Sequence, residues 1–329
     1  MFRLFEHKII SVINIDKMSK YFDNKTSFME PQVNQYGENF VMTNVMKPKK
    51  TKYLNIDTRF TDEYNYNYKD ASFNETKSYT ITLPERINNV ISIKVLSAEI
   101  PVSFYNISKS LGNNSFKISN NSTSISKMVV LADGIYTSTT LATEINYEMG
   151  LLGLSGISYQ TTNKKSVFSN TSSNSFVVYF DTDASGNFDK FNFRSKLGWM
   201  LGFRNISYNL TSVSGVITSE SFINLNTMRY LFLVVDEYNN SFQNSFLAPM
   251  YGYIMNKKIL ARISVDNQVF PFGTVLHGNL NDGILVSDHR CYNGTIDLQR
   301  LNIQLVNEWG VSVNLNGLDF SFLLEIQYE

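Results

Sequence analysis

Cysteine and histidine are scarce in this chain, whose 329 residues include one Cys and three His. A single thiol excludes an intramolecular disulfide and any zinc site built on several cysteines, and three imidazoles leave little for histidine chemistry. Charged residues make up only 18% of the chain, and 29 basic side chains balance 29 acidic ones. A net charge of zero excludes a protein whose whole surface attracts nucleic acid.

Long hydrophobic runs are also missing. No window approaches the roughly 18 uninterrupted apolar residues of a membrane-spanning helix. The N-terminal apolar run, Ile9 to Ile15, is short, follows the charged residues Arg3, Glu6 and Lys8, and lacks a small-residue cleavage site. We therefore predict no secretory signal, and expect the chain to be made and kept in a cytosol-like compartment.

Aromatic residues are abundant, with 24 Phe and 19 Tyr, so disorder over most of the chain is not expected. They alternate with polar residues along segments that resemble strands, which is how core and cross-strand pairs look. A platform for stacking bases or sugars is the alternative interpretation of these aromatics. The predicted strands include Ser78–Leu83, which stops at Pro84, Asn89–Ile100, Phe176–Phe180, Arg229–Val235, Ile259–Val265, Leu301–Val306 and Phe320–Ile326.

One helix interrupts the strands. Leu141, Ile145 and Met149 repeat every four residues on one face. Ser138 or Thr139 can cap the start of this helix, and Gly150 or Gly153 can end it. A second helical turn is predicted around Ser195 to Leu201.

Many short strands joined by Asn, Gly and Ser turns, with no internal repeat, favour a sandwich over alternating β-α units. The strand count predicts an all-β fold, a single jelly-roll β-sandwich with a short inserted helix and an extended N-terminal arm. We place the jelly-roll domain at residues 53–329 and the arm with its basic linker at residues 1–52. The arm shows no period of 2 or 3.6 residues, so it cannot bury a continuous face.

The arm ends in a cluster of lysines, Lys47, Lys49, Lys50 and Lys52. Such a cluster is typical of a solvated linker. The alternative interpretation is an electrostatic contact with an acidic partner surface or with nucleic acid. We retain the four lysines as candidate interaction residues.

The sequence offers no catalytic or cofactor motif. Asp181 to Asn187 resembles the start of a calcium loop, but the twelfth position carries Asn192 instead of glutamate, which favours a polar hairpin turn. His289 and Cys291 lie two residues apart, and an ordinary buried Cys beside a surface His is favoured over a catalytic dyad. Glycine-rich phosphate loops are absent. We expect a protein that is not an enzyme and that holds no cofactor or metal.

Several stretches of the chain, in their order and spacing, resemble the capsid proteins of large nucleocytoplasmic DNA viruses. The resemblance covers roughly residues 53–329 and rests on Tyr53–Phe60 (YLNIDTRF), Tyr79–Pro84 (YTITLP), Val90–Pro101 (VISIKVLSAEIP), Phe104–Ser108, Leu131–Tyr136 followed by Leu141–Asn146, Leu197–Arg204 (LGWMLGFR), Leu301–Gly317 and Asp319–Phe322. The arm matches no pattern of the family.

This resemblance implies a minor capsid protein of the single jelly-roll type, of which the penton at fivefold vertices is one form. The implied partners are the major capsid protein, with its double jelly-roll capsomers, other minor capsid proteins, and four further copies in a homopentamer. The implied location is the virion, after synthesis in the host cytoplasm, with no small-molecule substrate. Contact of the arm with nucleic acid or an inner membrane stays open, as do an inner-surface cement role and a lectin-like glycan-binding module.

Overall fold

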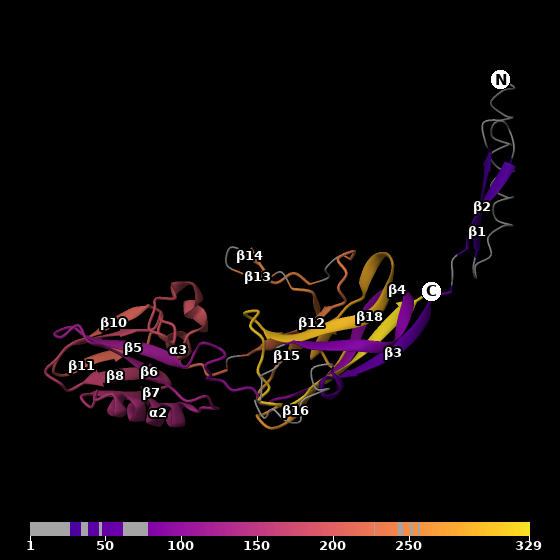
Figure 1. Ribbon diagram of the computed structural model, residues 1–329. Helices are drawn as coiled ribbons and strands as arrows, with labels where there is room; N and C mark the ends of the chain where they lie inside the picture. The colour runs from indigo at the N-terminus through magenta and orange to yellow at the C-terminus, as the bar shows by residue number, and fades with distance from the viewer. Residues whose placement is uncertain are drawn as a thin grey trace, which may run out of the picture.

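The computed structural model describes residues 27–33, 39–45, 48–61, 78–226, 228–242, 246–250, 253–255 and 257–329 (Figure 1). Lys47 and the first 26 residues of the predicted arm lie outside these ranges. Within them, no helix is long and apolar enough to cross a membrane. The predicted fold class is confirmed, because the described chain consists mainly of curled antiparallel sheets of the jelly-roll type with a short inserted helix.

The largest sheet has eight strands, and it includes both β3, near the start of the predicted domain, and β19, at the end of the chain. Its strands follow the order β17-β15-β12-β18-β4-β19-β3, with β16 paired to β4. Their bounds are β3 Lys50–Asp57, β4 Tyr79–Pro101, β12 Tyr230–Asp236, β15 Ile259–Ser264, β16 Val275–Asn279, β17 Leu285–Ser287, β18 Arg290–Asn307 and β19 Ser321–Tyr328.

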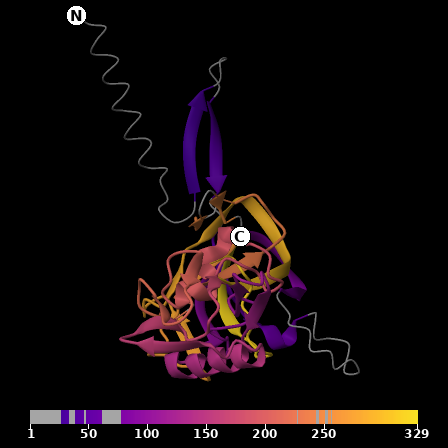
Figure 2. The same cartoon turned by 90° about the vertical axis from the view of Figure 1, so that its left-hand side faces the viewer.

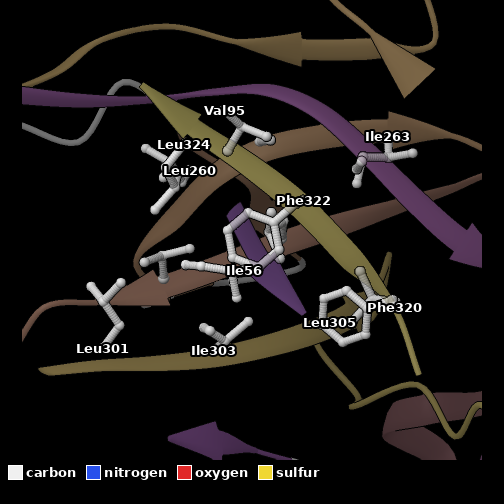
Figure 3. Packing of buried hydrophobic residues seen from close by; sticks show 14 of the residues in the cluster. Ile56, Val95, Leu260, Ile263, Leu301, Ile303, Leu305, Phe320, Phe322 and Leu324 are labelled. Atoms are coloured by element: carbon white, nitrogen blue, oxygen red, sulfur yellow. The ribbon is translucent and has the colours of Figure 1, made fainter. Parts of the chain in front are cut away.

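Two very long strands curl this sheet. β4 has 23 residues and pairs with β18, β19 and β16 along different parts of its length. Its pairing with the 18-residue β18 is interrupted by three register shifts. Each shift increases the local twist, so the sheet wraps around its own apolar face. Figure 3 shows side chains from β3, β4, β15, β18 and β19 meeting in that core, with Ile56, Phe322 and Leu324 among them.

Pro84 does not end a strand, contrary to our prediction of two separate strands from Ser78 to Ile100. β4 runs through this proline without interruption. Proline cannot donate a ladder hydrogen bond, so it is tolerated in a strand at a bulge or an edge. The register shift between the Leu298/Ile87 and Arg300/Thr82 pairs provides such a place.

A second, unpredicted hydrophobic core is formed by the part of the chain between β4 and β12. Here the sheet β10-β9-β5-β6 and the sheet β11-β8-β7 enclose a cluster of buried side chains that runs from Ile107 to Leu210. Their bounds are β5 Ser115–Asn120, β6 Ser126–Val130, β7 Ile157–Thr162, β8 Lys165–Asn170, β9 Phe176–Tyr179, β10 Ser207–Leu210 and β11 Gly215–Thr218. We call this part the insertion lobe and the eight-stranded part the jelly-roll lobe (Figure 1).

Aromatic rings fill the insertion core. Phe180 stacks on Phe203 with ring centroids 4.8 Å apart, and Phe168 contacts Phe116 and Tyr159 at 5.8 and 4.9 Å. All five of these side chains are buried. Interlocking rings of this kind provide contact energy beyond the area they bury. Most of the aromatics in this part of the chain therefore serve as core, as predicted.

The predicted helix is confirmed as α2, Ser138–Leu151, and buries Leu141, Ile145 and Met149. Its N-cap is Thr137, one residue before our candidates, because the Thr137 and Thr140 side chains form a reciprocal capping box. The second helical turn is α3, Leu197–Met200, preceded by the 3-10 turn η3, Lys190–Ser195. Two short pairs complete the fold, β1 (Ser27–Val33) with β2 (Asn39–Val45) and β13 (Pro249–Met250) with β14 (Tyr253–Ile254).

Candidate assembly surface

Three of the four candidate lysines lie on or beside the strand at the edge of the jelly-roll sheet. β3 begins at Lys50, inside the segment predicted as a linker, and Lys50 pairs with Tyr328 while Lys52 pairs with Ile326. Lys49 immediately precedes the strand, and all three side chains are exposed. Lys50 and Lys52 share one face, because side chains two residues apart in a strand point the same way.

β3 has a neighbour on one side only, since it ends the strand order of the sheet. The other side presents backbone N–H and C=O groups that a further strand can pair with. Among the described ion pairs none involves Lys49, Lys50 or Lys52. Lys52 Nζ lies 6.0 Å from the centre of the Tyr328 ring, which is a weak contact. The edge therefore carries uncompensated positive charge, which both guards it against random pairing and attracts an acidic partner.

Exposed aromatic residues flank the same edge. The side chains of Tyr53 and Phe60 are 63% and 78% exposed. Phe60 lies in η1 (Thr58–Phe60), a 3-10 turn fixed to the start of β19: the buried Thr58 hydroxyl donates to Asp319 Oδ1 at 2.8 Å and accepts from the Phe320 N–H at 3.0 Å. An exposed aromatic side chain on an anchored turn beside a free sheet edge is a suitable contact point for another protein.

Asp57 and Arg59 stabilise this turn. Arg59 Nε lies 3.0 Å from both carboxylate oxygens of Asp57, and the Arg59 backbone N–H donates to Oδ1 at 3.0 Å. The hydrogen bond from the Arg59 side chain holds the pKa of Asp57 below its usual value. The carboxylate is therefore charged and engaged, and it does not neutralise the lysines at the other end of β3.

The β1–β2 hairpin forms a sheet of its own and stands away from both lobes in Figures 1 and 2. It precedes β3 directly in the chain, and in Figure 1 it lies at the end of the molecule far from the insertion lobe. An isolated two-stranded hairpin is only marginally stable in water. Its two outer edges are open to pairing with another sheet.

The calcium-loop residues form a turn, as the sequence favoured. Asp183 accepts hydrogen bonds from the backbone N–H groups of Ser185 and Asn187, each at 2.9 Å. Thr182 and Phe188 form an isolated antiparallel β-bridge that closes the turn. These backbone hydrogen bonds, led by that from Asn187, lower the pKa of Asp183. No group of three or more metal-binding side chains occurs among the described residues.

His289 and Cys291 do not form a dyad in this structure. His289 Nδ1 lies 3.2 Å from the Ser92 hydroxyl, while the Cys291 thiol contacts the backbone oxygen of His289 at 3.9 Å. Cys291 is exposed, so our interpretation of it as a buried core residue is wrong. β18 turns this side chain outward because its neighbours Arg290 and Tyr292 point inward.

Comparison with known proteins gives little at the level of sequence. No family model matches the chain, and no curated protein matches it. Among solved structures, the chain is similar to the crystal structure of the selenomethionine-labelled mavirus penton protein, with 12% sequence identity and a TM-score of 0.44. The match covers 84% of this chain and 99% of that one. A likeness this distant does not assign a function to the present chain.

Proposed function

We propose that this chain is a minor capsid protein of a large icosahedral DNA virus and forms the penton at fivefold vertices. The observation that carries the proposal is the open edge of β3, which is continuous with a hairpin that stands away from the body. One copy can thus offer a hairpin while its neighbour offers an edge. Head-to-tail contacts of this kind close into a ring when the rotation between copies allows it.

The two-lobed shape supports the same assignment. The β1–β2 hairpin and the basic edge lie at one end of the molecule and the insertion lobe at the other (Figure 1). In a shell, the jelly-roll end can contact neighbouring copies and capsomers while the insertion lobe projects. An inner-surface cement role is the alternative that uses the same arm. Density in an intact particle distinguishes the two, since the proposal requires fivefold positions and the alternative requires positions beneath the shell.

Deleting residues 1–45 tests the role of the arm. This boundary removes the hairpin but leaves β3 whole, so Lys50 still pairs with Tyr328. We expect a folded protein whose thermal unfolding midpoint stays within about 2 °C of the full chain, because the hairpin forms a separate sheet. Incorporation into particles, measured by quantitative immunoblotting of purified virions, is expected to fall at least tenfold. Normal incorporation of the truncated chain would contradict the proposal.

Replacing Lys49, Lys50 and Lys52 with glutamine tests the basic edge separately. All three side chains are exposed, so the free energy of unfolding is expected to change by no more than about 0.5 kcal/mol each. If the lysines meet an acidic surface, incorporation of the variant should fall relative to the unmodified chain, and this difference should shrink when particles assemble at higher salt, because salt screens the lysine contacts of the unmodified chain. The matched control replaces Arg86, Lys164 and Arg300 with glutamine, because these cations are also exposed and lie outside β3. Equal incorporation of the two triple variants would show that the three lysines only keep this edge solvated and contact no acidic partner.

A further inference from the structure

A cleft of about 780 Å³ lies between the two lobes and contains both tryptophans of the chain, Trp199 and Trp309. Trp199 belongs to α3 of the insertion lobe, and Trp309 follows β18 of the jelly-roll lobe. Both rings are half-buried. The volume falls within the range of about 300–1,000 Å³ that is usual for ligand sites.

Positive charge dominates this cleft. Lys109, Arg194, Lys196, Arg204 and Arg229 line it, against the acidic residues Asp189 and Glu308. Lys196 pairs with Asp189 at 2.9 Å, and Arg229 pairs with Glu308 at 3.2 Å. In the described part of the chain no ion pair involves the remaining three cations. Both acidic residues that line the cleft are thus paired, and about three of its cations remain for an anionic ligand.

Two of these cations gather at one ring. The guanidinium carbon of Arg204 lies 4.1 Å from the centre of the Trp199 ring, and that of Arg194 lies 5.5 Å from it. Phe193 fixes the ring by an edge-to-face contact at 5.7 Å. Both arginines also line the cleft, so an anion bound there gains from both charges.

Arg204 is oriented before any ligand arrives. Its Nη1 donates to the backbone oxygens of Trp199 and Phe203 at 3.0 and 2.9 Å. Glu220, the carboxylate nearby, accepts from the Arg204 backbone N–H at 3.0 Å and from the Tyr208 hydroxyl at 2.6 Å, and does not bond the guanidinium. A fixed guanidinium loses little freedom on binding a carboxylate, which favours affinity.

We propose that this cleft binds an acidic saccharide, whose carboxylate meets Arg194 and Arg204 and whose ring packs against tryptophan. The exposed amides of Asn224 and Asn226 line the same cleft and match the donors and acceptors of sugar hydroxyls. A bounded cleft suits a small ligand better than a nucleic-acid strand, which needs a groove that follows many phosphates. The inference does not depend on the capsid role.

Intrinsic tryptophan fluorescence of the full chain provides the measurement, because both tryptophans lie in the cleft. We expect a saturable change on titration with sialyllactose and none with lactose, which lacks the carboxylate. The double variant K109Q/R194Q changes two exposed side chains and should weaken binding at least tenfold. R86Q, which changes an exposed arginine outside the cleft, is the matched control and should bind normally.

Several results would overturn the proposal. These are no saturable response to sialyllactose, equal responses to sialyllactose and lactose, or equal affinity in K109Q/R194Q and R86Q. Binding of single-stranded oligothymidylate in preference to sialyllactose, lost in K109Q/R194Q, would reassign the cleft to nucleic acid. Unfolding midpoints of both variants within about 2 °C of the unmodified chain establish that any loss of binding is not a loss of folding.

Discussion

Replacing Arg290 with methionine is expected to lower the free energy of unfolding by about 3–5 kcal/mol. Arg290 is the largest fully buried side chain of the described structure, and its Nη1 pairs with Glu237 Oε2 at 2.9 Å. Both side chains are at most 1% exposed. Methionine fills a similar volume but leaves the Glu237 carboxylate buried without its cation.

The arginine also satisfies the backbone around it. Nη1 donates to Val235 O at 2.7 Å and Nη2 donates to Lys258 O at 2.8 Å, while the Phe242 ring centre lies 4.5 Å from the guanidinium carbon. Arg290 thus connects β18 to β12 and to Lys258, the residue immediately before β15. Removing it breaks three hydrogen bonds and one charge pair together.

The loss should depend on pH. Burial raises the pKa of Glu237 above its usual value, and the charge of Arg290 opposes that rise. Without the arginine the folded-state pKa rises further above the unfolded value of about 4.3. The folded variant then binds a proton more tightly than the unfolded chain, so its stability falls as pH rises through that window. Denaturant unfolding should show a larger deficit for R290M at pH 7 than at pH 4.5.

Two further variants keep this prediction falsifiable. In R290M/E237L the orphaned carboxylate is gone, so the double variant should recover at least about 2 kcal/mol relative to R290M. R300M changes an exposed arginine on the same strand and should stay within about 0.5 kcal/mol of the unmodified chain. A deficit in R290M/E237L as large as the sum of the two single losses would show that the pair has no coupling.

Local pattern predicted local structure well in this chain. The spacing of Leu141, Ile145 and Met149 predicted both the helix and its buried face, because a period of 3.6 residues is a property of the helix itself. Most strands were predicted from the alternation of apolar and polar residues, because a period of 2 residues is likewise a property of the strand itself. Pro84 misled the prediction, since the register shift that accommodates it depends on β18, more than 200 residues away in the chain.

The second core was beyond prediction from periodicity. Strands of the insertion lobe alternate apolar and polar residues in the same way as strands of the jelly-roll lobe, so hydrophobic pattern does not reveal which apolar faces meet.

The sequence predicted only part of the candidate assembly surface. The lysines were visible as a charge cluster, but their position on an edge strand follows from the pairing of Lys50 with Tyr328 at the far end of the chain. Nothing in the local sequence marked Tyr53 and Phe60 as exposed.

Gly202 gives the second large effect. It follows α3 with a φ of +93°, and Phe203 N donates to Gly198 O at 2.9 Å, which completes a Schellman-type end to the helix. A Cβ at this position would lie 2.2 Å from Ser221 O and 2.9 Å from Ser221 C. These are backbone atoms, and Ser221 N donates to Gly202 O at 2.9 Å, so neither segment can move away freely.

We expect Gly202→Ala to lower the free energy of unfolding of the insertion lobe by about 2–5 kcal/mol, the sum of left-handed strain and steric overlap. Gly273→Ala is the matched control, because Gly273 has a φ of +88° but no atom within 4 Å of the position that a Cβ would take. Gly273→Ala should lower the free energy of unfolding only by the strain of the left-handed backbone, about 1–2 kcal/mol. Native-state hydrogen exchange on peptides from residues 107–225 would locate the loss, since faster exchange there in Gly202→Ala alone is expected. Equal losses in the two variants would mean that the approach of Ser221 to Gly202 does not constrain the fold, and that backbone conformation alone selects glycine at this turn.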